Sequence, residues 1–187
     1  NEAWIRQQPN WTAEAPVFPF VLTGQKIDRS LYDHVNSYTG ETGSDGVVRV
    51  ASANLNARYV KLVQKPDPDN SGDWRATKLV QAFSRTAPAT AMAVLPGLAH
   101  SGSVMGIQKS VRLTGSHPTV DAILECIRVR DQADYNRVVE DFRLLTETTQ
   151  AAERVEDRAV LFGIQRTFRH PATTQVIVRL RDNAGYA

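Results

Sequence analysis

Two polar side chains in this sequence have the types and the chain order that acid–base chemistry requires. Asp45 lies in GSDGVVRVASANL (residues 43–55), and His100 lies further on in LPGLAHSGSVMG (95–106). An aspartate that accepts a hydrogen bond from the Nδ1–H of a histidine fixes the ring tautomer and stabilises the protonated ring. The same histidine can then take a proton from a nucleophile through its other nitrogen. We therefore interpret Asp45 and His100 as two members of one catalytic site.

The residues beside Asp45 are suited to hold its carboxylate in place. Gly43 and Gly46 flank Ser44–Asp45, and the hydrophobic pair Val47–Val48 follows at once. Glycine adopts positive φ angles without strain, so a sharp turn is expected here, with the valines anchoring the loop in the core. An Asp-Gly pair by itself is usually only a turn, so the catalytic interpretation depends on these flanking residues and on the later histidine.

The elements that would position both side chains are short strands. Residues 17–24 (VFPFVLTG) and 90–97 (TAMAVLPG) are apolar runs that end at glycine, as is typical of buried strands. Asp45 and His100 then fall on loops beyond strands, where functional side chains are usually presented. Residues 47–55 predict a short helix behind the acid loop.

The remaining segments predict one hairpin, two helices and a β-rich end. Residues 57–65 and 73–84 read as strands joined by the turn cluster 66–72. Because the stretch 64–88 is long for a connection between the acid and the histidine, we interpret it as an insertion that covers the site. Apolar residues at i, i+3, i+4 and i+7 predict two amphipathic helices within 116–150. After the charged stretch 151–158, alternating residues predict a second hairpin, with one strand around 160–168, a turn at 169–174 and a partner strand around 176–180.

Composition narrows the class of protein. The chain has 187 residues, 42% hydrophobic and 22% charged, which suits a globular domain with a real core. Its net charge of +2, without a basic stripe containing aromatic residues, argues against nucleic acid as a partner. The longest near-apolar run, 89–98, is too short to be a transmembrane segment. No cellular compartment is indicated.

Neither a metal site nor a disulfide is expected. The single cysteine, Cys126, cannot form an intrachain disulfide and falls in an apolar helical pattern, so we expect a buried, unreactive thiol. The other three histidines lack an acidic neighbour at motif spacing and are expected to be structural or solvent-facing: His34, His117 and His170.

The two loops resemble those of lipase- and esterase-like α/β-hydrolases. SDGVVRVASANL (44–55) looks like the acid loop of that family, and LPGLAHSGSV (95–104) is similar to its histidine loop. The resemblance covers roughly residues 15–115 and implies the order serine, acid, histidine, with Asp45 and His100 as the second and third members. It implies hydrolysis of carboxylic esters, with lipids among the candidate substrates, and no cofactor.

The resemblance also implies an architecture. The fold class would be α/β, the C-terminal part of an α/β-hydrolase sheet followed by two helices and a small β appendage. Residues 1–115 would form the rear half of the hydrolase core, and 116–187 the helical pair and the start of the appendage.

The nucleophile is the main departure from the family pattern. No G-x-S-x-G motif occurs, and Ser103, the nearest candidate, has Met105 in place of the second glycine and follows the histidine. Arg49 also stands where these acid loops often have proline. We therefore interpret the chain as cut at both ends and inactive alone, its serine supplied by an upstream portion of the protein or by a second chain. The alternative is a non-catalytic binding module derived from a hydrolase-like scaffold.

Overall fold

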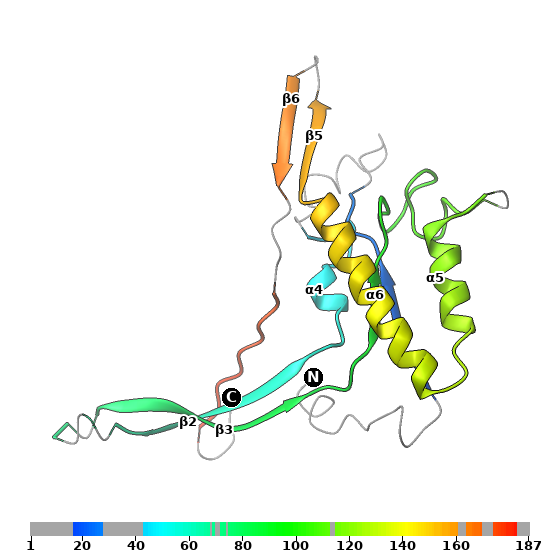
Figure 1. The fold of residues 1–187 in the computed structure, drawn as a ribbon. Helices are drawn as coiled ribbons and strands as arrows, with labels where there is room; N and C mark the ends of the chain where they lie inside the picture. Colours follow the sequence, from blue (N-terminus) through cyan, green and yellow to red (C-terminus); the bar gives the residue numbers. More distant parts are fainter. Residues whose placement is uncertain are drawn as a thin grey trace. The chain divides into compact units, whose positions relative to one another are not determined.

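The computed structural model describes residues 17–27, 43–67, 69, 72–73, 75–112, 115–160, 164–169 and 174–182 (Figure 1). The chain divides into two compact units. One consists of residues 1–19 and 55–90, and the other of residues 20–54 and 91–187. No helix in the described ranges is long and apolar enough to cross a membrane.

Two short parallel strands form the centre of the second unit. Strand β1 (Phe20–Thr23) pairs with β4 (Ala91–Val94) in the register Phe20↔Ala91 to Thr23↔Val94. Both predicted strands are confirmed. Every residue of β4 is buried, whereas three of the four residues of β1 are only partly buried. A parallel pair requires a crossover connection, as in the sheets of α/β proteins. The first part of that connection contains the predicted short helix, α4 (Val50–Ala53).

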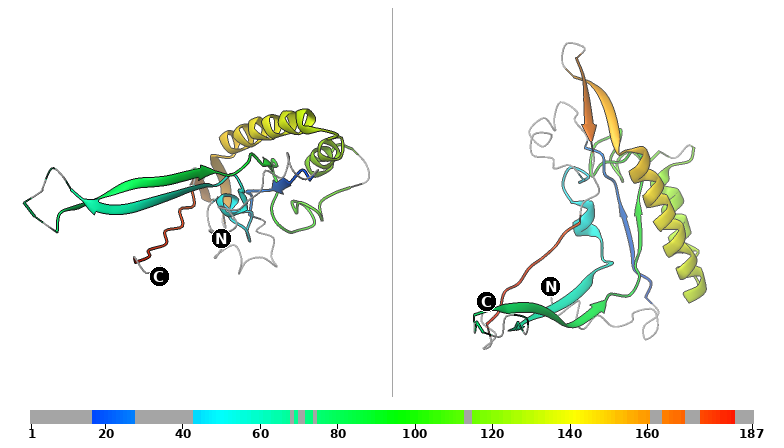
Figure 2. Two further views of the ribbon diagram at one scale, coloured as in Figure 1. Left: turned by 90° about the horizontal axis from the view of Figure 1, so that it is seen from below. Right: turned by 60° about the vertical axis from the view of Figure 1, so that its left-hand side comes forward.

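The core around β4 comes from both helices that contact it. Val50 of α4 packs with Met92 and Val94 of the strand. The long helix α6 (Gln132–Ala152) runs alongside β4, as Figures 1 and 2 show, and Tyr135 is fully buried there. Its ring meets Phe20 of β1 edge-on, with 5.5 Å between ring centroids, and burial raises the pKa of its hydroxyl.

Side chains of α6 also satisfy backbone groups of β4. The Thr146 hydroxyl accepts a hydrogen bond from the N–H of Val94 (3.0 Å) and donates one to the carbonyl of Met92 (3.1 Å). The Tyr135 hydroxyl accepts one from the N–H of Ala91 (3.1 Å). Buried backbone groups must be paired, and here a helix takes the place that another strand would fill. The edge of β4 that faces away from β1 is therefore closed by Thr146 at Met92 and Val94, whereas the Ala91 N–H that Tyr135 binds is on the side that faces β1.

The predicted helix pair is confirmed as α5 (Pro118–Ile127) and α6. Each helix begins at a side-chain cap: His117 accepts from the N–H of Thr119, and Asp131 from the N–H of Asp134. The helices lie in the same compact unit as β1 and β4. The expected division into domains at residues 1–115 and 116–187 stays a prediction.

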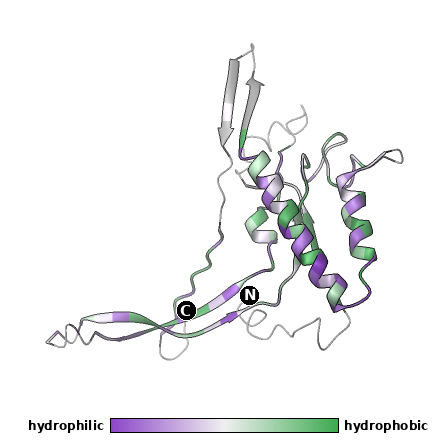
Figure 3. Ribbon diagram, in the orientation of Figure 1, coloured by the Kyte–Doolittle hydropathy of each residue, from purple (hydrophilic) through white to green (hydrophobic). Residues whose placement is uncertain are grey.

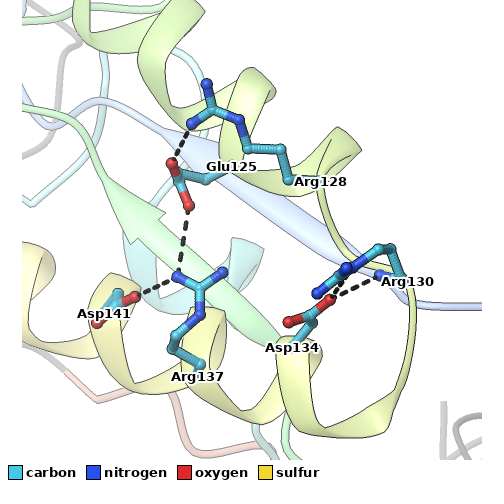
Figure 4. A network of polar contacts seen from close by, with 6 residues as sticks. All are labelled: Glu125, Arg128, Arg130, Asp134, Arg137 and Asp141. Atoms are coloured by element: carbon cyan, nitrogen blue, oxygen red, sulfur yellow. Dashed lines mark hydrogen bonds and ion pairs between the residues drawn. The ribbon is translucent and has the colours of Figure 1, made fainter.

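Exposed ion pairs link the turns of these helices and the helices themselves (Figure 4). Glu125 of α5 pairs with Arg128 at 2.7 Å and with Arg137 of α6 at 3.5 Å. Asp134 pairs with Arg130 at 2.9 Å, and the hydrogen bond from this guanidinium lowers the pKa of Asp134. Solvent screens such pairs, so each contributes little to stability.

The first unit contains the predicted hairpin. Strands β2 (Arg58–Pro66) and β3 (Thr77–Thr86) pair antiparallel from Arg58↔Thr86 to Pro66↔Thr77, with a bulge between Lys61 and Leu62. The predicted turn cluster at 66–72 lies in the connection between them. Its interpretation as an insertion over the site stays a prediction.

The second predicted hairpin is wrong in its partners. Strand β5 (Val155–Val160) pairs with β6 (Ile164–Arg169), so the chain reverses within the segment read as one strand. Residues 174–182 form no strand, and Val176 and Leu180 are about four-fifths exposed. The charged residues at 156–158 break the alternation of apolar residues on which strand prediction depends, so β5 was missed.

Candidate active site

The acid loop is a tight turn held by its own backbone. Gly43 and Gly46 have φ angles of 85° and 102°, as the sequence predicted. The N–H of Asp45 donates to the carbonyl of Val48 (3.1 Å), and the N–H of Val50 donates to that of Gly43 (2.9 Å). The turn therefore ends where α4 begins, and the helix fixes it against the core.

The Asp45 carboxylate is buried and oriented by this turn. Its Oδ1 accepts hydrogen bonds from the N–H groups of Val47 (3.0 Å) and Val48 (2.7 Å), and the residue is only 5% exposed. Hydrogen bonds to an ionised group are stronger than those between neutral groups. They fix the carboxylate plane and leave Oδ2 for another donor.

That donor is His100. Its Nδ1 lies 3.1 Å from Asp45 Oδ2, within hydrogen-bonding distance, and its backbone N–H donates to the Asp45 carbonyl at 2.8 Å. Because the carboxylate can only accept, Nδ1 carries the hydrogen and the lone pair of the neutral ring is on Nε2. The side chain is 46% exposed, and no group in the described ranges hydrogen bonds to Nε2.

The histidine loop is tied to the end of β1. The N–H of Leu95 donates to the carbonyl of Thr23 (2.7 Å), and that of Lys26 donates to the carbonyl of Leu98 (2.9 Å). A Cβ at Gly24 would lie 2.1 Å from the Leu98 carbonyl oxygen, so only glycine fits. This close approach extends the parallel pairing of β1 and β4 to within two residues of His100.

The same loop is held by residues that follow it. The Ala99 N–H donates to the carbonyl of Met105 (2.8 Å), and the Ala99 carbonyl accepts from the N–H of Ile107 (2.9 Å). The Thr119 hydroxyl, in the first turn of α5, donates to the Ile107 carbonyl at 2.6 Å. The start of α5 is thereby connected to the residue that precedes His100.

His117 contributes a second connection. Its Nδ1 accepts from the N–H of Thr119 (3.2 Å), so the ring hydrogen is on Nε2, which lies 3.0 Å from the hydroxyl oxygen of buried Ser110. The Ser110 hydroxyl in turn donates to the carbonyl of Gly106 (2.5 Å). His117 is therefore structural, as predicted. The other two predicted structural histidines, His34 and His170, lie outside the described residues.

Sequence reasoning missed Glu153, which supports the turn before His100. Its Oε1 accepts from the N–H of Gly97 at 2.6 Å, and the residue is buried although it follows α6 in a charged stretch. Its Oε2 is buried and has no partner within the described part. Nothing in the sequence distinguishes this carboxylate from its exposed neighbours, because only packing buries it.

The described residues supply an acid and a histidine but no nucleophile. Ser103 is exposed on the loop after His100, where its carbonyl accepts from the Arg112 guanidinium (3.0 Å). No hydroxyl in the described ranges hydrogen bonds to the His100 ring. The arrangement can orient an imidazole and stabilise its positive charge.

The chain is similar to solved structures of a phospholipase. It is 39% identical to phospholipase PlaB from Legionella pneumophila in complex with thio-NAD, with a TM-score of 0.76, and the match covers 90% of this chain and 34% of that one. A second structure of phospholipase PlaB from Legionella pneumophila is 42% identical, with a TM-score of 0.70. This match covers 82% of this chain and 31% of that one. The chain thus spans about a third of the length of these structures.

The likeness supports a hydrolase-like fold with mixed strands and helices in small sheets. No family model and no curated protein matches the chain. The assignment to the C-terminal part of a hydrolase stays a prediction.

Proposed function

We propose that the protein containing this chain is a serine hydrolase that cleaves the carboxylic esters of phospholipids. The observation that carries the proposal is the hydrogen bond between Asp45 and His100, which pairs a buried carboxylate with a half-exposed imidazole. The similarity to a phospholipase supports the choice of substrate class.

In this mechanism the chain supplies the acid and the base. Nε2 of His100 takes the proton of a serine hydroxyl as its oxygen attacks the ester carbonyl, and Asp45 stabilises the resulting imidazolium through Nδ1–H. Backbone N–H groups hold the oxyanion. The imidazolium then returns its proton to the leaving alcohol, and water hydrolyses the acyl-enzyme by the same sequence of proton transfers.

The closed edge of β4 indicates where the serine-bearing segment would enter. Thr146 occupies that edge at Met92 and Val94, so we expect a further strand to extend this sheet beside β1. No described strand pairs with the second edge of β1. We place the upstream portion of the protein, or a second chain, at this edge.

A fluorophosphonate probe tests the proposal, because it labels only an activated serine. The full-length protein is treated with the probe, the labelled peptide is identified by mass spectrometry, and release of fatty acid from phosphatidylglycerol is measured in parallel. We expect the label on a serine outside residues 1–187 and its loss in His100→Ala, while Ser103→Ala labels normally.

Two outcomes would overturn the proposal. A label on Ser103 would place the nucleophile inside the chain and contradict the assigned order. Absence of both labelling and hydrolysis, in a protein that melts cooperatively, would favour the non-catalytic binding module instead.

A further inference from the structure

The strands of the β2–β3 hairpin carry only positive charges. The charged residues are Arg58, Lys61 and Lys65 in β2, and Lys78 and Arg85 in β3. Neither strand contains an aspartate or a glutamate. The whole chain has a net charge of only +2, so this local excess is offset elsewhere and not within the strands.

Four of these five cations lie on one face of the hairpin. Side chains alternate between the faces of a strand, and paired residues share a face. The register therefore groups four cross-strand pairs, which we term the cationic face: Tyr59↔Arg85, Lys61↔Phe83, Val63↔Val80 and Lys65↔Lys78. The bulge takes up one extra residue of β3 and keeps the pairs on either side of it on this face.

The pair Lys65↔Lys78 places two like charges opposite each other on this face. Like charges directly opposite each other destabilise a hairpin. Lys78 is partly compensated by Asp67, 3.5 Å away, and by Asp69, 4.0 Å away, whereas exposed Lys65 pairs with no carboxylate of the described residues. An anionic partner would relieve the repulsion.

Apolar side chains separate the cations on the same face, so strand pairing assembles a basic face with aromatic residues that was not recognised in the sequence. Phe83 is 49% exposed beside Lys61, and its ring packs against Tyr59 with 6.0 Å between ring centroids. Figure 3 shows hydrophilic and hydrophobic residues interspersed along both strands. At a membrane interface, long lysine side chains reach the lipid phosphates, and aromatic rings lie at the level of the headgroups. The cationic face carries both kinds of side chain.

We propose that the cationic face docks on an anionic phospholipid surface. A single-stranded nucleic acid is the less suitable partner, since it needs aromatic faces free for base stacking, and here the two rings pack on each other. The valine pair between the cations has no role in phosphate binding, but it can enter the headgroup region. The proposal concerns the hairpin and does not depend on hydrolysis.

Vesicle co-sedimentation of the full-length protein tests the proposal. Every variant also carries Asp45→Asn, so that hydrolysis cannot alter the lipid and failure of binding is separate from failure of the proposed function. Lys61→Gln/Lys65→Gln removes two charges from the cationic face. The matched control, Gln81→Glu/Thr86→Glu, lowers the net charge equally at two exposed positions of the opposite face.

On vesicles of phosphatidylcholine with phosphatidylglycerol, we expect the lysine variant to bind about 25-fold more weakly, or about 5-fold per lysine. The control should stay within about 3-fold, and all forms should bind pure phosphatidylcholine weakly and lose affinity as salt is raised. Unchanged binding by the lysine variant, or an equal loss in the control, would overturn the proposal. So would tighter binding to a single-stranded oligonucleotide than to the anionic vesicles.

Discussion

His100 and Asp45 are joined by two hydrogen bonds, one from Nδ1 to Oδ2 at 3.1 Å and one from the His100 N–H to the Asp45 carbonyl at 2.8 Å. The side-chain bond sets the orientation of the imidazole, and the backbone bond sets the distance between the loops. The two loops are therefore tied to each other, and groups of the chain itself align the imidazole. Such pre-organisation is what a catalytic base requires.

Asp45→Asn should abolish activity without unfolding the protein. The N–H groups of Val47 and Val48 will keep the amide oxygen in the Oδ1 position, so the amide NH₂ will face His100. The ring is then forced to carry its hydrogen on Nε2, so this nitrogen cannot take the proton of the serine. We expect kcat on a soluble ester to fall by about 10⁴, as for the corresponding change in a serine protease.

The control for this prediction is Val47→Ala, which keeps the backbone N–H and alters an exposed side chain. Its kcat should be near that of the parent protein, and both variants should show melting curves close to the parental one. Retention of most activity by Asp45→Asn would show that Asp45 does not orient the base.

Gly24→Ala should destabilise the protein strongly. The new Cβ would lie 2.1 Å from the carbonyl oxygen of Leu98, a backbone atom that cannot move without displacing the histidine loop. We expect a loss of about 1–3 kcal/mol in the free energy of unfolding, measured in urea. Gly72→Ala is the matched control, because no atom lies within 4 Å of its Cβ position. Equal midpoints for the two variants would contradict the packing argument.

The same threonine-to-valine change should affect the free energy of unfolding differently at two positions. The Thr149 hydroxyl is buried without a partner in the described ranges, so Thr149→Val should be neutral or stabilise by about 1 kcal/mol. The Thr119 hydroxyl donates to the Ile107 carbonyl at 2.6 Å, and Thr119→Val should cost about 1–2 kcal/mol. Chemical denaturation measures both. A destabilised Thr149→Val would reveal a partner for that hydroxyl.

Cys126 should react slowly with alkylating reagents. Burial raises the pKa of its thiol from 9.0 to about 11. The thiolate is the reactive form, so at pH 8 the folded protein should present about 100-fold less of it than the unfolded chain. Iodoacetamide labelling followed by mass spectrometry, with and without urea, compares the two states. The rate should rise as pH approaches 11, and equal rates at pH 8 would contradict this prediction.

Local elements were readable from the sequence because their signals are local. Apolar runs ending at glycine predicted β1 and β4, helical periodicity predicted α5 and α6, and a turn cluster predicted the β2–β3 hairpin. The positive φ angles of Gly43 and Gly46 also followed from the acid-loop motif.

The tertiary structure alone decided which groups meet. Sequence order suggested Asp45 and His100 as partners, but their distance depends on the pairing of β1 with β4 across a long connection. Nothing in the sequence indicated that Glu153 is buried, or that the charged segment of β5 forms a strand. Periodicity reports how a segment meets solvent, whereas a hydrogen bond between distant segments depends on packing that no single segment encodes.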